Sequence, residues 1–222
     1  MRRATTLEVA HATVAGEALE LHPCGAIYWA AQSAVLLADV HLGKARHFQR
    51  AGIPVPTGVN DTNLEKLLYL LVEYRPERLL LLGDLFHSDF NAAWDEFAAL
   101  VKQFAHVRFE LILGNHDRYA DTRYTRAGMA LHAEHLDLGP FHLTHEPAEE
   151  VPDGLFNLAG HIHPCVHLHG GGKQRLRLPC FHFGPRSGLL PAFGTFTGMH
   201  PIPVTSQDQV FVIAEDSVVR VR

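Results

Sequence analysis

Nine residues of types that bind metals or transfer protons stand directly after apolar runs in this sequence. They are Asp39, His41, Asp84, Asn115, His116, Asp117, His145, His161 and His163. Carboxylate, amide and imidazole groups together suit borderline divalent ions, which accept mixed oxygen and nitrogen ligands. A single histidine at the end of a strand is more often a hydrogen-bonded structural residue, so the prediction rests on the whole series. The series predicts a site for a pair of metal ions.

The spacing of two histidine-containing pairs supports one shared site. Asp39 and His41 are two residues apart, and so are His161 and His163. Alternate residues of a strand point to the same face, so we expect each pair to aim at one place. Polar residues at the carboxyl ends of buried strands are also where open α/β sheets form their sites.

The tripeptide Asn-His-Asp at 115–117 suggests acid catalysis beside a metal ligand. His116 adjoins Asn115 and is the natural general acid for a leaving alkoxide. We expect Asp117 to orient His116 and to raise the pKa of its imidazole. A structural His-Asp pair at a turn is the alternative.

Two segments that follow ligand candidates mix cations with aromatic rings. The predicted substrate-binding residues are Lys44, Arg46, Arg118, Tyr119, Arg123, Tyr124 and Arg126. Such mixtures suit unpaired nucleotides, whose phosphates contact arginine and whose bases stack on rings. A solvated helix or loop face explains the same residues equally well.

The apolar patterns indicate how these residues are held. A helix is predicted over 62–74, with Thr62 and Glu65 as a capping box and an apolar stripe of Leu64, Leu67, Leu68 and Leu71. A second helix is predicted over 92–104, between continuous apolar strands at 78–84 and 107–115. Short strands dominate after Arg126. The pattern predicts two packed sheets flanked by helices in one domain that spans 1–222.

Composition narrows the class of protein. The 222 residues carry a formal net charge of -5, so global charge does not require a nucleic-acid partner. No apolar run reaches the ~18–20 residues of a membrane span, so we expect no membrane partner, and the start "MRRATTLEVAHATVAG" has no apolar core of signal-peptide length. The three cysteines, Cys24, Cys165 and Cys180, are an odd number and form no CxxC pair, which favours a reducing cytoplasm; their role stays open.

The series "DVH", "GD", "GNHD", "H" and "GHIH" resembles the calcineurin-like metallophosphoesterases, over Asp39 to His163. The resemblance implies a four-layer αββα sandwich of the α/β class and two divalent metal ions. It implies that Asp84 bridges the ions, that Asp39, His41 and His163 hold the first, and that Asn115, His145 and His161 hold the second. Mn²⁺ is the favoured ion, with Fe, Zn and Ni as alternatives. Some branches carry Asp where this chain has His87, which leaves the role of His87 open.

A narrower resemblance covers nearly the whole chain. Segments such as "ADVHLGKARHFQRAGIPVP", "LRLPCFHFGP" and "LPAFGTFTG" are similar to the bacterial ligase-associated DNA damage response phosphoesterases. This implies a phosphodiesterase or endonuclease that acts on single-stranded DNA or RNA during repair. It also implies a functional association with DNA ligase and helicase repair proteins.

Two other functions are compatible with the same motifs. One is a phosphoesterase for a small molecule, such as a cyclic nucleotide or a nucleotide-derived substrate. The other is a scaffold that has lost its chemistry, but such a protein should lack some ligands or the general acid. Every one of those positions carries a competent residue in this chain.

Overall fold

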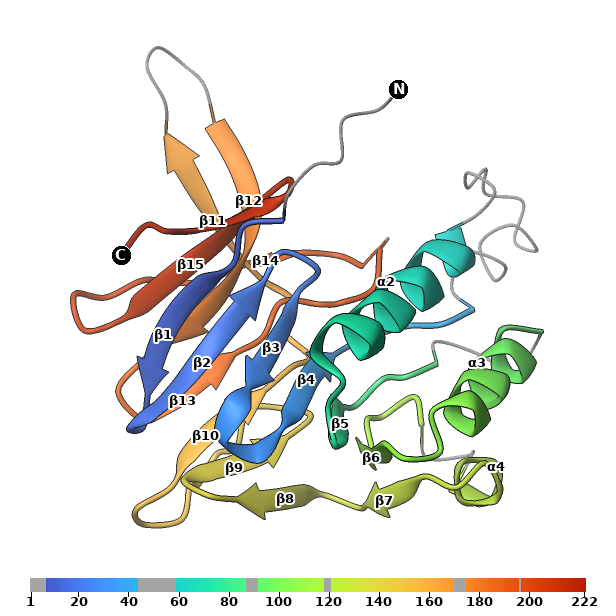
Figure 1. The fold of residues 1–222 in the computed structure, drawn as a ribbon. Coiled ribbons are helices and arrows are strands. Elements are labelled where there is room, and N and C mark those ends of the chain that lie inside the picture. The colour runs from blue at the N-terminus through green and yellow to red at the C-terminus, as the bar shows by residue number, and fades with distance from the viewer. Residues whose placement is uncertain (1–6, 44–58, 87–91, 118–120, 170–174, 196) are drawn as a thin grey trace, which may run out of the picture.

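Two β-sheets packed face to face form the centre of the computed structural model, with helices on one side (Figure 1). The structure describes residues 7–43, 59–86, 92–117, 121–169, 175–195 and 197–222. The helical elements are η1 (Ala30–Gln32), α2 (Val59–Tyr74), α3 (Ala92–Gln103) and α4 (Asp121–Arg126). No helix in this part of the chain is both long enough and apolar enough to cross a lipid bilayer.

The first sheet has seven strands in chain order. They are β1 (Ala10–Val14), β2 (Glu17–His22), β3 (Ala26–Trp29), β4 (Ala34–Ala38), β5 (Arg78–Leu82), β6 (Arg108–Ile112) and β7 (Ala130–His132). Strands β1 to β4 pair antiparallel, whereas β4, β5, β6 and β7 run parallel. The parallel half matches the β-α-β-α-β order predicted from the sequence.

Strict alternation of side chains explains why the parallel strands are apolar throughout. In β4, Val35 and Leu37 pack against the helices, whereas Leu36 and Ala38 pack between the sheets. In β5, Leu81 and Leu80 divide in the same way. Because both faces are covered, neither set of positions tolerates a polar residue without a partner. The helix-facing core and the intersheet core therefore hold β4 and β5 in one register.

The second sheet covers the far face of the first. Its strands are β8 (His135–Leu138), β9 (Phe141–Thr144), β10 (Phe156–Ala159), β11 (Pro164–His169), β12 (Arg175–Phe183), β13 (Ser187–Leu189), β14 (His200–Pro201), β15 (Gln209–Ala214) and β16 (Ser217–Arg220). The path β14-β11-β12-β13-β10-β9-β8 is joined at β12 by β15, which pairs with β16. Phe141, Leu158 and Phe181 meet the first sheet.

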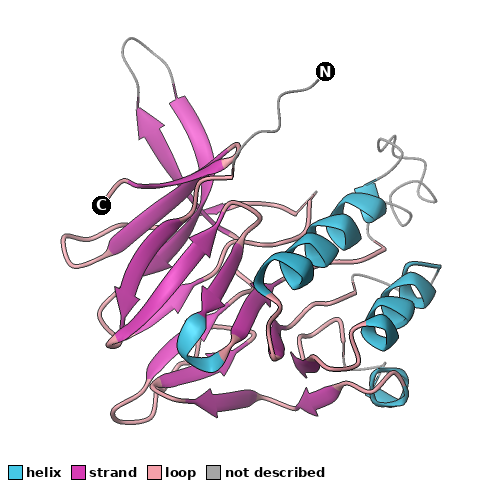
Figure 2. Cartoon of the chain, viewed as in Figure 1, coloured by secondary structure: helices cyan, strands magenta, loops and turns pink. Residues whose placement is uncertain are grey.

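This arrangement confirms the α/β sandwich. Figure 2 shows that α2, α3 and α4 all lie on the side of the first sheet. Within the described residues, no helix covers the outer face of the second sheet, where Val166, Cys180 and Val210 form a small apolar cluster. The outer helical layer of the predicted αββα order is therefore seen on one side only.

Helix α2 corrects two details of the sequence prediction. It begins at Val59, so Thr62 lies inside the helix and the predicted capping box is wrong. Its buried leucines are Leu67, Leu70 and Leu71, whereas Leu68 is exposed. The helix is thus rotated relative to the predicted stripe. It ends at Tyr74 as predicted, because Pro76 cannot continue it and Arg75 turns into the left-handed region.

A buried carboxylate interrupts the apolar strand β6. Glu110 is 1% exposed, and its Oε1 accepts hydrogen bonds from Nε of Arg78 at 2.8 Å and from Nη2 at 2.7 Å. Its Oε2 lies 2.9 Å from Nε2 of His132 and 3.4 Å from Nη2 of Arg108. One carboxylate in the middle of β6 therefore joins three neighbouring strands, β5, β6 and β7.

Removing this carboxylate should destabilise the sandwich. Glu110→Ala leaves Arg78 without its partner in a largely dry place, and we expect a loss of about 3 kcal/mol in the free energy of unfolding. Urea denaturation measures this loss. The exposed Glu96→Ala on α3 is the control and should change stability by no more than about 0.5 kcal/mol. Equal, small effects of both variants would contradict the structural role of Glu110.

Candidate metal centre

Two groups of predicted ligands converge where β4, β5, β6, β9 and β10 end. One group contains Asp39, His41 and His163, and the other contains Asp84, His145 and His161. In each group the ligand atoms lie within 4.8 Å of one another. Nε2 of His163 is 3.5 Å from Oδ1 of Asp39, and Nδ1 of His161 is 3.1 Å from Nε2 of His145. The two groups bring together six of the seven residues that the family resemblance implied as ligands, and their binding of metal stays a prediction.

Asp84 faces both groups. Its Oδ1 lies 3.6 Å from Nε2 of His145 in the second group, and its Oδ2 lies 4.0 Å from Nε2 of His41 in the first. A carboxylate whose two oxygens face different ligand sets has the arrangement needed to bridge two ions. Asn115 joins the second group, since its Oδ1 lies 2.9 Å from Nε2 of His145.

The ligands stand on loops, not on strands. Strand β4 ends at Ala38 and β10 ends at Ala159, so both predicted pairs with two-residue spacing lie beyond the regular sheet. The expectation that a strand face aligns them is therefore wrong. Left-handed backbone aims them instead: φ is +52° at Asp39, +48° at His41, +46° at Asp84, +65° at His161 and +52° at His163. Such conformations are costly outside glycine and cluster at functional sites.

Hydrogen bonds fix which nitrogen two of the histidines present. Nδ1 of His145 lies 3.1 Å from the carbonyl oxygen of Leu82, and Nδ1 of His163 lies 3.1 Å from that of Gly198. A carbonyl can only accept, so Nδ1 carries the proton in both rings. Each Nε2 faces an aspartate and is the nitrogen that would bind an ion. This is the usual support of a histidine ligand by a second hydrogen bond.

The chemistry of the two groups fits a pair of cations. Asp39 is fully buried, and its Oδ1 receives no hydrogen bond from the described residues, although its Oδ2 accepts the N–H of His161 at 2.8 Å. Asp84 is 4% exposed and shares the site. No described arginine or lysine pairs with either buried carboxylate, and divalent ions bound here would supply the missing positive charge.

Two glycines leave room for these side chains. A Cβ on Gly114 would lie 2.3 Å from Oδ1 of Asp84, and a Cβ on Gly83 would lie 2.1 Å from Nδ1 of His145. Gly83 also has a φ of +75°. The glycines of "GD" and "GNHD" are therefore needed for the close approach of neighbouring ligands.

Comparison with known proteins identifies the family. The sequence pattern that defines the calcineurin-like phosphoesterases matches residues 33–195. The chain belongs to this family. The resemblance to the calcineurin-like metallophosphoesterases is thus confirmed, and the chain is a metal-dependent phosphoesterase.

A solved structure extends the likeness beyond the matched segment. The crystal structure of the Pseudomonas putida nuclease MPE is 32% identical to this chain, with a TM-score of 0.81 over 96% of this chain and all of that one. The structure of AQ665, a protein of unknown function from Aquifex aeolicus, is 20% identical, with a TM-score of 0.41 over 63% of this chain and 82% of that one. A comparison with curated protein sequences found no significant match.

In this phosphoesterase, His116 lies at the open side of the metal centre. Its side chain is 44% exposed, and its Nε2 lies 3.9 Å from Oδ2 of Asp84. Its backbone N–H donates to Oδ1 of Asp84 at 3.2 Å. The imidazole thus lies beside Asp84 and reaches solvent, which is compatible with the predicted role of a general acid.

Asp117 has other partners than the predicted one. It is fully buried, and its Oδ1 accepts the N–H of Leu85 at 3.1 Å and the O–H of Tyr124 at 3.0 Å. Its Oδ2 accepts the N–H of Gly114 at 3.1 Å. Burial raises the pKa of Asp117 to about 6, and the hydrogen bonds from Gly114 and Tyr124 act in the opposite direction. These contacts assign Asp117 to holding together the loops of Asp84 and Asn115, and not to the imidazole of His116 that the sequence predicted as its partner.

The predicted substrate-binding residues have mixed outcomes. Tyr124 is fully buried in the helix-facing core, so the prediction that its ring stacks on a base is wrong. Arg123 and Arg126 are exposed on α4. Four others, together with His87, lie outside the described residues: Lys44, Arg46, Arg118 and Tyr119.

The three cysteines are free; Cys165 and Cys180 are buried.

Sequence reasoning missed residues that support the first metal group. Asn63 is buried in α2, and its Nδ2 donates to the carbonyl of Val40 at 3.2 Å while its Oδ1 accepts the N–H of Thr195 at 3.2 Å. Nζ of Lys66 donates to the carbonyl of Phe193 at 2.7 Å. The sequence did contain a signal for Asn63: a polar residue one turn before Leu67, on the buried side of the helix, needs hydrogen-bond partners inside the protein.

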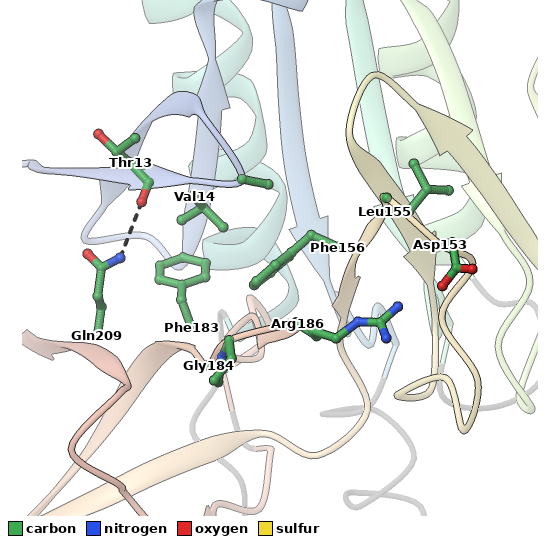
Figure 3. A pocket seen from close by; sticks show the side chains of 12 residues that line it. Thr13, Val14, Asp153, Leu155, Phe156, Phe183, Gly184, Arg186 and Gln209 are labelled. Carbon is green, nitrogen blue, oxygen red and sulfur yellow. Dashed lines mark hydrogen bonds between the residues drawn. The ribbon is translucent and has the colours of Figure 1, made fainter.

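The structure has another pocket and a third group of metal-ligating side chains, and both lie apart from this centre. A pocket of about 390 Å³ lies at the amino end of β10, between Val14, Phe156, Phe183 and Arg186 (Figure 3). The metal ligands follow the carboxyl end of the same strand. A third group, His135, Asp137 and His142, lies on the β8–β9 hairpin, where Asp137 and His142 hydrogen-bond to each other at 2.6 Å.

Metal content should follow the two groups. Asp84→Ala should release both ions because it removes a ligand from each group, whereas His145→Ala should mainly empty the second group. Elemental analysis after dialysis against Mn²⁺ measures ions per chain. The exposed His106→Ala, outside both groups, should keep the wild-type content. A fully active wild-type protein that saturates with one ion per chain would contradict this assignment.

Asp117→Asn should reduce stability. The amide offers one acceptor oxygen where the carboxylate offers two, and its NH₂ would face backbone N–H groups. We expect a loss of about 2–3 kcal/mol in the free energy of unfolding, against about 1 kcal/mol for Tyr124→Phe, which removes one hydrogen bond. Chemical denaturation measures both. If Asp117→Asn kept full stability and slowed only substrates with poor leaving groups, Asp117 would act on His116 after all.

Proposed function

We propose that this phosphoesterase hydrolyses phosphodiester bonds in nucleic acid, with single strands as its substrate. One observation carries the proposal: Asp84 faces two ligand groups and lies beside an exposed imidazole, His116. That combination provides for two cations and for a proton donor at one phosphate. The complete ligand set argues against a non-catalytic scaffold.

The residues divide the reaction between them. Divalent ions bound here supply Lewis acidity toward the phosphoryl oxygens and lower the pKa of a water molecule toward ~7. Asp84 sets the separation of the two ligand groups. His145 and His163 keep fixed tautomers through Leu82 and Gly198, so neither ring needs to reorient during turnover. We propose Mn²⁺ as the activating ion, with Fe, Zn and Ni as alternatives.

His116 supplies the proton that the leaving alkoxide needs. Its backbone N–H is tied to Asp84, so its position follows that of the bridging carboxylate. Its exposed ring can exchange protons with water after each turnover. A phosphodiester has a single negative charge, so the site needs no additional cations for a second charge. Diesters should therefore be hydrolysed faster than monoesters.

Support for a nucleic-acid substrate comes from the neighbour and from the surface. The P. putida protein, 32% identical over nearly the whole chain, is called a nuclease. Arg123 and Arg126 are exposed on the helix that follows the "GNHD" loop. By the narrower sequence resemblance we propose a role in bacterial DNA repair, in the cytoplasm, in functional association with DNA ligase and helicase proteins.

The leaving group tests the role of His116. His116→Ala should slow hydrolysis of a diester with an alkoxide leaving group by ~10²–10⁴-fold. The loss should be much smaller with bis-p-nitrophenyl phosphate, because p-nitrophenolate leaves without a proton. Rates with Mn²⁺ on both substrates measure this, with His106→Ala as the control. Equal losses on both substrates would show that His116 is not the acid.

A further inference from the structure

A groove of about 620 Å³ separates α3 from α4. Its walls carry three cations, Lys102 from α3 and Arg123 and Arg126 from α4, and all three are exposed. Asp95 is the one carboxylate among the residues that line it. The groove is therefore a local positive surface on a protein whose formal net charge is -5.

The opposite side of α3 provides a comparison. A groove of about 320 Å³ between α2 and α3 is lined by Glu65 and Glu96, with leucines and no cation. Two grooves beside one helix thus differ in the sign of their charge. A polyanion that approaches this face is attracted to the α3–α4 groove and repelled from its neighbour.

Helical spacing explains how α4 serves two purposes. Arg123 and Arg126 are three residues apart and share the groove face, whereas Tyr124 turns inward to the core. Among the described carboxylates, none forms an ion pair with Lys102 or Arg126. Their charges are therefore available to an external anion.

A chain of side-chain contacts runs from the groove to the loop of His116. Trp94 lines the groove, is partly exposed, and packs edge-on against Tyr124 with 5.4 Å between ring centroids. The hydroxyl of Tyr124 donates to Asp117, which adjoins His116. Small side chains, Ala98 and Ala127, also line the groove and leave room for a ligand along its length.

We propose that the α3–α4 groove binds the phosphates of a single-stranded nucleic acid and that Trp94 stacks on one of its bases. The inference rests on the proposed nuclease function and adds the path of the strand. The proposed binding residues are Arg123 and Arg126, which the sequence predicted, and Lys102 and Trp94, which it did not. Three phosphate contacts and one ring match the way proteins hold unpaired strands.

Salt dependence tests the cations. We compare wild type with Lys102→Gln/Arg123→Gln/Arg126→Gln in binding a fluorescent oligothymidylate, in chelator and over a range of salt. Each single-strand phosphate contact contributes roughly 0.7 to the slope of log K against log salt, so the slope should fall by about 2 and low-salt affinity by about tenfold or more. Wild-type metal content and thermal midpoint show that the variant is folded.

A matched variant separates local from global charge. Arg175→Gln/Arg177→Gln/Arg222→Gln removes the same charge from exposed positions on β12 and at the carboxyl end. It should keep the wild-type slope. An unchanged groove variant, or equal losses in both variants, would overturn the proposal.

Fluorescence tests the ring. The chain has two tryptophans, and Trp29 is 1% exposed in the core, so quenching by the oligonucleotide reports Trp94. We expect quenching in wild type and none in Trp94→Phe; quenching that persists in Trp94→Phe contradicts the stacking. Wild-type cleavage of oligonucleotide and bis-p-nitrophenyl phosphate with Mn²⁺ is measured alongside. If neither is cleaved, the proposed function fails and this inference with it; if both are cleaved and the groove variant binds normally, only the groove fails.

Discussion

Two buried carboxylates surrounded by histidines are the constraint around which this structure is organised. Asp39 is fully buried and Asp84 nearly so, and no arginine or lysine of the described residues forms an ion pair with either. Buried charges of one sign are strongly unfavourable without compensation. Divalent ions provide that compensation, so metal binding and folding of this edge are thermodynamically coupled.

Hydrogen bonds between the loops stabilise the left-handed backbone conformations of the ligands. Left-handed backbone at Asp39, His41 and Asp84 is unfavourable on its own, yet each residue lies in a tightly fixed loop. The N–H of His41 donates to the carbonyl of Asp84 at 3.0 Å, which ties the loop of the first group to that of the second. Asn63 holds the carbonyl of Val40 from the helix side. These contacts hold the ligand loops against one another and against α2.

The sequence predicted chemistry better than geometry. The ligand types were recognisable because carboxylates and histidines after apolar runs have few structural uses in such a series. The backbone that aims them was not recognisable, since the two-residue spacing at Asp39 and His41 is equally compatible with a strand and with a left-handed loop. Asp117 illustrates the same limit. Its type allowed a partnership with His116, but only the fold shows that backbone N–H groups surround it.

Helix α4 shows why side-chain type alone does not define a binding surface. In the sequence, one short segment mixes cations with an aromatic ring: Arg123, Tyr124 and Arg126. In the helix, the two arginines lie on the exposed face, whereas Tyr124 lies on the buried face. The buried ring then has a different use, because it packs on Trp94 and hydrogen-bonds Asp117. The partly exposed aromatic ring beside these arginines is Trp94, which comes from α3. Tyr124 therefore links the proposed binding groove to the loop of Asp117, and a change in its packing would affect both.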